Sequence, residues 1–145
     1  MSKYNVVLHS TKRVVGSSIV NAGYNFNFGN MPEGDYKMSF SLYSSVGTIA
    51  LLDSTLIVAI RDLGIVSPSF SGGSDTNTPS NGYLGVVASW YAGNTGNYLY
   101  ANYLSNSPIQ LLTKPSSNNF SVQLLRIDGT PATITNDYVL TLYFE

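Results

Sequence analysis

Large apolar residues occupy every second position over three stretches of the chain, 24–28, 36–42 and 138–144. Successive side chains of a strand point to opposite faces of a sheet, so this period of two predicts strands with one buried face. Other stretches are apolar at nearly every position, which is typical of strands buried on both faces. These additional predicted strands are 4–8, 55–60, 83–90 and 120–127. Further candidate strands are 98–104 and 109–112, separated by a turn that contains Pro108.

Short segments rich in Gly, Asn, Asp and Pro separate these stretches, and they supply the backbone angles that turns require. Residues 30–35 contain four such residues and lie between the alternating stretches 24–28 and 36–42. This spacing predicts a β-hairpin over 24–42. No segment has a helical period of useful length, and residues 48–52 are expected to form one turn at most.

The strand count, about eight to ten, is typical of an all-β, antiparallel β-sandwich. One domain over residues 1–145 is expected, since neither half of the chain alone would bury a full core. The longest segment without a strand pattern is 67–82, where Phe70 is the only large apolar residue. Loops of this length in compact domains are usually functional or disordered, and this one is expected to be a mobile surface excursion and not a domain linker.

Composition narrows the range of functions. Charged residues make up 10% of the chain, the formal net charge is −1, and Ser, Thr, Asn and Tyr are abundant. A nucleic-acid surface would need clustered Lys and Arg, so no nucleic-acid contact is predicted. With no Cys and a single His, disulfide scaffolds, thiolate sites and multi-histidine metal sites are excluded.

Candidate catalytic residues are few. His9 is the only imidazole and follows a strand-like run, where a surface position is favoured over a general base. Asp53 and Asp62 flank one predicted strand, where Asp is common for structural reasons, although two carboxylates could also form a glycosidase pair. Asp75 and Asn77 place oxygen ligands at alternate positions but lack the other residues of an EF-hand loop. The chain is therefore predicted to be no enzyme, with no cofactor and no metal site.

The aromatic residues give a stronger indication of a binding surface. They cluster around the turn at 93–96, and aromatic rings stack on sugars, fill cores and populate protein interfaces. The predicted interface or ligand surface comprises Trp90, Tyr91, Tyr98, Tyr100 and, in the long loop, Phe70.

The first residues do not show the basic segment followed by an apolar segment that is typical of a secretory signal peptide. No window of the sequence reaches the ~18 apolar residues of a membrane span. Folding in a cytosol is therefore expected. So few charges leave a neutral surface of Ser, Thr, Asn and Tyr, with little to keep strand edges apart. This surface favours a domain that works inside an assembly.

Five segments of the sequence resemble a known family. They are the opening strand at 4–8, the predicted aromatic hairpin at 24–42, and the segments 82–87, 117–125 and 137–145. In this order, across nearly the whole chain, they resemble the small single jelly-roll capsid proteins of large icosahedral double-stranded DNA viruses. These include penton and minor capsid proteins.

The resemblance implies a single jelly roll of eight antiparallel strands in two four-stranded sheets. It also implies a structural role in the virion capsid after synthesis in the host cytoplasm. The expected partners are copies of itself, with a pentamer favoured, and other capsid proteins; no catalytic residues carry over. Two rival hypotheses remain: a carbohydrate-binding β-sandwich that uses Trp90 and nearby tyrosines, and a cupin-like enzyme, which the single His disfavours.

Overall fold

The computed structural model describes residues 4–63, 65–66, 83–102, 109–111, 113–115 and 118–145. Every strand pair among them is antiparallel, and these residues form three short 3₁₀ turns but no α-helix. The prediction of an all-β, antiparallel fold is confirmed. The strands are β1 (Tyr4–His9), β2 (Asn21–Asn25), β3 (Tyr36–Ser44), β4 (Thr55–Arg61), β5 (Ile65–Val66), β6 (Tyr83–Tyr91), β7 (Asn97–Asn102), β8 (Ile109–Leu111), β9 (Asn119–Arg126) and β10 (Tyr138–Phe144), and the 3₁₀ turns are η1 (Ser10–Lys12), η2 (Leu51–Asp53) and η3 (Gly93–Thr95).

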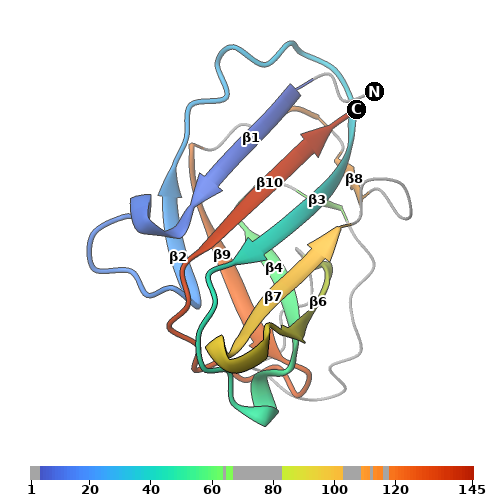
Figure 1. The fold of residues 1–145 in the computed structure, drawn as a ribbon. Helices are drawn as coiled ribbons and strands as arrows, with labels where there is room; N and C mark the ends of the chain where they lie inside the picture. The colour runs from blue at the N-terminus through green and yellow to red at the C-terminus, as the bar shows by residue number, and fades with distance from the viewer. Residues whose placement is uncertain (1–3, 64, 67–82, 103–108, 112, 116–117) are drawn as a thin grey trace.

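The strands pair in a nested order. β1 pairs with β10, β2 with β9, β3 with β7 and β8, and β4 with β6. Because β4 also pairs with β9 and β6 with β7, one continuous path results, β1-β10-β3-β7-β6-β4-β9-β2. Figure 1 shows β1, β10, β3 and β7 as a front layer, with β2, β9, β4 and β6 behind it. The molecule is thus a barrel-like sandwich whose two layers are joined through the β6–β7 hairpin.

One buried cluster fills the space between the layers and draws residues from Val6 to Phe144. Where β1 begins and β10 ends, this core is aromatic: the Phe28 ring lies 6.3 Å from that of Phe144 and 6.0 Å from that of Phe120. A buried hydrogen bond of 3.1 Å, from the Tyr24 hydroxyl on β2 to the Tyr138 hydroxyl on β10, links the two layers. Burial raises the pKa of both phenols above the ordinary value.

β4 explains why residues 55–60 are apolar at nearly every position. Leu56, Val58 and Ile60 face the core, while Ile57 and Ala59 on the opposite face are buried as well. The strand lies between β6 and β9, so both its edges are also paired. The expectation of a strand buried on both faces is therefore correct.

The predicted hairpin over 24–42 is wrong. β2 ends at Asn25 and pairs with β9, whereas β3 pairs with β10, β7 and β8. The connecting segment crosses from one layer to the other and inserts Phe28 and Met31, each 1% exposed, into the core. Phe28 thus packs on the core from a segment that is not a strand. For this reason the aromatic alternation in the sequence continues past the end of β2.

The expected turn at 48–52 and the expected loop at 67–82 remain to be compared with the structure. The single turn expected over 48–52 lies further along the chain, at η2, and overlaps that range only at Leu51 and Leu52. The long loop at 67–82, with Phe70, and parts of the predicted strands 98–104 and 109–112 lie outside the described residues.

Candidate functional site

Four aromatic side chains share the outer surface of the β3–β7–β6 region, and we call them the aromatic face: Tyr43, Tyr98, Tyr100 and Trp90. Their chain neighbours Leu42 and Leu99 are buried in the core, so by the alternation of strands the aromatic residues point outward. Cross-strand pairing sets Trp90 opposite Tyr98 and Tyr43 opposite Tyr100. Three neighbouring strands therefore contribute to one aromatic surface.

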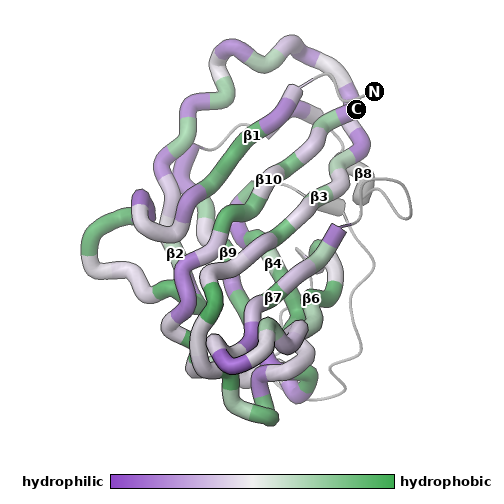
Figure 2. Tube along the Cα trace, viewed as in Figure 1, coloured by the Kyte–Doolittle hydropathy of each residue, from purple (hydrophilic) through white to green (hydrophobic). Residues whose placement is uncertain are grey.

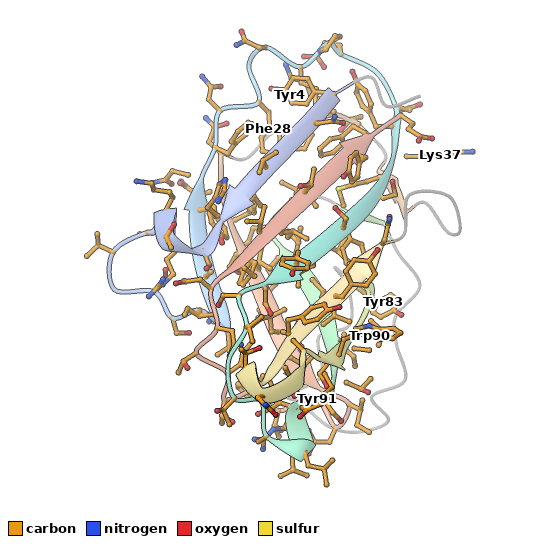
Figure 3. All side chains as sticks on the ribbon, in the orientation of Figure 1. Tyr4, Phe28, Lys37, Tyr83, Trp90 and Tyr91 are labelled. Atoms are coloured by element: carbon orange, nitrogen blue, oxygen red, sulfur yellow. The ribbon has the colours of Figure 1, made fainter. Side chains whose placement is uncertain are left out.

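Two rings of this face contact each other, and three of its four side chains are exposed to water. The Tyr43 and Tyr98 ring centroids lie 5.3 Å apart at an interplanar angle of 34°. Trp90 is 56% exposed, Tyr43 54% and Tyr100 42%. Figure 3 labels Trp90 on β6, where its side chain extends from the side of the molecule. Neighbouring exposed rings of this kind are typical of a binding surface.

A tight turn holds Trp90 in register with Tyr98. The Ala92 amide donates to the Gly96 carbonyl over 2.8 Å, and the Thr95 hydroxyl donates to the Ala92 carbonyl over 2.7 Å. Gly96 has φ +109°, and a Cβ there would lie 2.5 Å from the Gly47 carbonyl oxygen. Only glycine fits this close approach of the turn to the β3–β4 connection.

An open cleft of about 240 Å³ begins at Tyr43 and extends over the adjoining ends of β1, β3 and β10. The surface that lines it is mainly apolar, with His9, Thr11 and Asp137 among the residues that form it. The complete lining is His9, Thr11, Tyr43, Ser44, Ser45, Asp137, Tyr138 and Val139. The aromatic face therefore continues directly into an open, mainly apolar hollow that has a few polar residues at its edge.

Ser10 fixes the carboxylate of this cleft. Its fully buried hydroxyl donates to Asp137 Oδ1 over 2.8 Å and accepts the Tyr138 amide over 2.9 Å. Ser, His and Asp thus occur close together, but the Ser10 oxygen is enclosed and already engaged. Ser10 therefore offers no exposed nucleophile to this cleft.

The structure brings together three of the five residues predicted for a binding surface. Trp90, Tyr98 and Tyr100 lie on the aromatic face, whereas Tyr91 points to the opposite side of β6 and is 74% exposed. Phe70 lies outside the described residues. The sequence prediction missed Tyr43, although the alternation over 36–42 already implied that position 43 faces outward.

Asp53 and Asp62 do not form a catalytic pair. They lie beyond opposite ends of the seven-residue strand β4, which puts them more than about 20 Å apart. Asp53 is 1% exposed and accepts hydrogen bonds from Arg126 Nε at 2.8 Å and from the Thr133 hydroxyl at 2.7 Å. Burial alone would raise the pKa of Asp53, but these hydrogen bonds and the Arg126 charge hold the pKa below its ordinary value.

Possible metal ligands were considered among the described residues. Those residues contain no group of three or more His, Cys, Asp or Glu side chains placed to share an ion. The oxygen-rich segment with Asp75 and Asn77 lies outside the described residues. Among the described residues, no helix has the length and apolar character of a membrane span.

A second exposed apolar surface lies at the end of the molecule where β4 begins, and we call it the aliphatic end: Leu51, Leu52 and Ile127. Leu51 is 88% exposed, Ile127 74% and Leu52 70%. The ion pair of Asp53 with Arg126 ties η2 to the end of β9 and so holds the three residues near each other. Figure 2 shows the strongly hydrophobic colour of the η2 turn at this lower end.

In comparisons with known proteins, no family model matches this chain and no curated protein matches it.

Proposed function

We propose that this chain is a structural subunit of a viral capsid, a penton or minor capsid protein. It acts by associating with copies of itself and with other capsid proteins, and it resides in the virion. Three features support the proposal: the resemblance in sequence, the nested order in which the strands pair, and the aliphatic end.

The nested strand order supports a single jelly roll. Pairing the first strand with the last and each following strand with the next one inward is what results when a long antiparallel ribbon is rolled up. The path then divides into two four-stranded halves, β1-β10-β3-β7 and β6-β4-β9-β2, which correspond to the two layers in Figure 1. Jelly rolls occur in many capsid subunits but also elsewhere, so the fold alone assigns no role.

The observation that carries the proposal is the exposure of Leu51, Leu52 and Ile127 on two segments that the Asp53–Arg126 ion pair joins. Large aliphatic side chains in contact with water lower the solubility of a free monomer and gain free energy when a neighbour covers them. Asp53 and Arg126 at this end neutralise each other, and the exposed Asp128, directly after Ile127, is a charge that a neighbouring copy must pair or leave in water. A head-to-tail contact that closes by rotation would produce a ring, and a ring of five fits a capsid vertex.

Light scattering after size-exclusion chromatography of the full chain tests this proposal. The expected result is a species of about five times the 15.7 kDa of one chain, with ring-shaped particles in negative-stain electron microscopy. A monomer that persists up to about 1 mM chain, roughly the weak limit of specific association, would contradict it.

A further inference from the structure

We propose that the aromatic face and the adjoining cleft form a binding site for a neutral glycan, with the ring faces of its sugars stacked on Trp90, Tyr43 and Tyr100. This activity goes beyond the proposed capsid role and does not depend on it. A subunit that displays the site would attach a particle, or the isolated protein, to a carbohydrate-coated surface.

The size of the aromatic face suits a short oligosaccharide. From β3 to β6 the face extends over two strand spacings, about 10 Å, because neighbouring strands lie about 4.8 Å apart. Tyr43 and Tyr98 form one close ring pair, and Trp90 and Tyr100 extend the surface along and across the strands. Such a platform accommodates two or three sugar rings, each with an apolar C–H face against an aromatic ring.

Three residues of the cleft can supply the hydrogen bonds that stacking lacks. Sugar hydroxyls need both donors and acceptors, and the cleft lining includes the His9 imidazole, the Thr11 hydroxyl and the Asp137 carboxylate. The hydrogen bond from Ser10 fixes Asp137 before any ligand arrives. Preorganised acceptors of this kind lower the entropy cost of binding. Tyr43 lines both parts of the site, so a glycan chain can pass from the rings into the cleft.

The charge pattern favours a neutral ligand over an acidic one. Tyr43, Tyr98, Tyr100 and Trp90 are uncharged, and Ala88, which pairs with Tyr100 on the same face, is uncharged as well. Asp137 in the cleft would repel a sialylated or sulfated sugar. Lys12 directly follows the cleft residue Thr11, so the charges at that edge are mixed, and the preference for a neutral ligand rests on the uncharged rings. Lys37 pairs near the start of β3, away from Tyr43.

The same site differs from a surface built for a protein partner. Its exposed tyrosines carry phenol hydroxyls and adjoin the cleft with His9 and Asp137, whereas the side chains of Leu51, Leu52 and Ile127 are hydrocarbon only. Charge does not separate the two surfaces, because the aliphatic end adjoins Asp53, Arg126 and Asp128; the hydroxyls and the cleft do. Burial of the aromatic face between protein chains is nevertheless a measurable outcome of the test.

The intrinsic fluorescence of Trp90 tests the proposal directly, because Trp90 is the only tryptophan of the chain. Cellohexaose, chitohexaose and mannohexaose are titrated separately into the purified protein. For at least one of them we expect a saturable change in Trp90 emission with a dissociation constant of about 10 μM to 1 mM. A sialylated lactose is expected to bind at least about tenfold more weakly, because of the Asp137 charge.

Variants then locate the site. Tyr43→Ala and Tyr100→Ala are expected to weaken binding about tenfold or more, while Tyr43→Phe keeps the ring and most of the affinity. Trp90→Ala, followed by calorimetry, should also lose binding. Tyr91→Ala is the matched control: it removes an exposed ring next to Trp90 but on the opposite side of β6, and affinity should stay within about twofold.

Two results overturn the glycan site. One is the absence of any emission change with all three neutral sugars at about 10 mM, well above the weakest expected dissociation constant. The other is an equal loss of affinity in Tyr91→Ala and Tyr43→Ala, which would mean that the rings of the aromatic face are not the contact. Neither result changes the mass measured by light scattering, so the capsid proposal is tested independently of the glycan site. If the aromatic face is instead buried in an oligomer, Trp90 emission will shift with protein concentration and the sugars will have no effect.

Discussion

The aromatic face and the aliphatic end are both exposed and apolar, but their chemistry differs. At the aliphatic end, Leu51, Leu52 and Ile127 have no polar atom in their side chains. On the aromatic face, each tyrosine ends in a hydroxyl, and Tyr43 adjoins a cleft with His9 and Asp137. A hydrocarbon surface gains most from being covered permanently, while an amphipathic one can remain in water until a ligand arrives. The difference suggests one surface for assembly and one for recognition.

Each of the two surfaces is positioned by its own set of local contacts. A close backbone contact between Gly96 and Gly47 positions the aromatic face, and it depends on the absence of a side chain at Gly96. The aliphatic end depends on a buried carboxylate, Asp53, and its bonds to Arg126 and Thr133. Because the two sets of contacts share no residue, changes in one should leave the other surface intact.

The largest expected effect comes from charging the aliphatic end. Leu51→Asp combined with Leu52→Asp should convert the oligomer into a monomer of 15.7 kDa, since two buried carboxylates without partners oppose association strongly. Light scattering measures this change. Val15→Asp serves as the control, because Val15 is 99% exposed in the β1–β2 connection and its replacement should leave the mass unchanged. Loss of glycan binding in the double variant would contradict the separation of the two surfaces.

A smaller effect is expected from Gly96→Ala. The added Cβ meets the Gly47 carbonyl at a φ of +109°, which should cost about 2–3 kcal/mol of folding free energy. Chemical denaturation measures this cost, and glycan affinity should fall at the same time because Trp90 loses its register with Tyr98. Gly93→Asn is the matched control: Gly93 also has a positive φ, +69°, but its Cβ position is open, so the cost should stay below about 1 kcal/mol. Equal costs for both variants would refute the role of the close contact.

The smallest expected effect is a pH dependence at the aliphatic end. Folding lowers the pKa of Asp53 below its ordinary value of 3.8, so its ionised form stabilises the fold. That stabilisation is complete above the ordinary pKa and is lost as the pH falls through the lower pKa of the folded chain. Asp53→Asn should therefore be less stable at neutral pH, by about 1–2 kcal/mol, and should lose less stability between about pH 4 and pH 2. Parallel denaturation curves across this range for both proteins would argue against the ion pair with Arg126.

Much of the fold could be predicted because strand alternation is a local property. The alternation over 36–42 and 138–144 correctly places Met38, Phe40 and Leu142 in the core. Pairing is a long-range property, and here the prediction failed: residues 24–28 and 36–42 are close in sequence, yet β2 pairs with β9 instead of β3. Phe28 continues the local pattern only because it reaches the core from a segment that crosses between layers.

The candidate site shows the same limit. Trp90, Tyr98 and Tyr100 were predicted as a group because they surround one turn. Tyr43 belongs to the group through the β3–β7 register, and position 43 lies more than fifty residues from Tyr98 in the sequence. The spacing of residues in the sequence cannot predict such a distant neighbour. It also cannot predict the cleft, which brings together His9 at the end of β1 and Asp137 before β10.

An electron cryomicroscopy structure of the assembled oligomer tests the division between the two surfaces most directly. The expected result is a closed ring in which Leu51, Leu52 and Ile127 are covered by a neighbouring copy, while Trp90 and Tyr43 stay open to solvent. An assembly that buries the aromatic face between copies and leaves the aliphatic end in water would contradict the account.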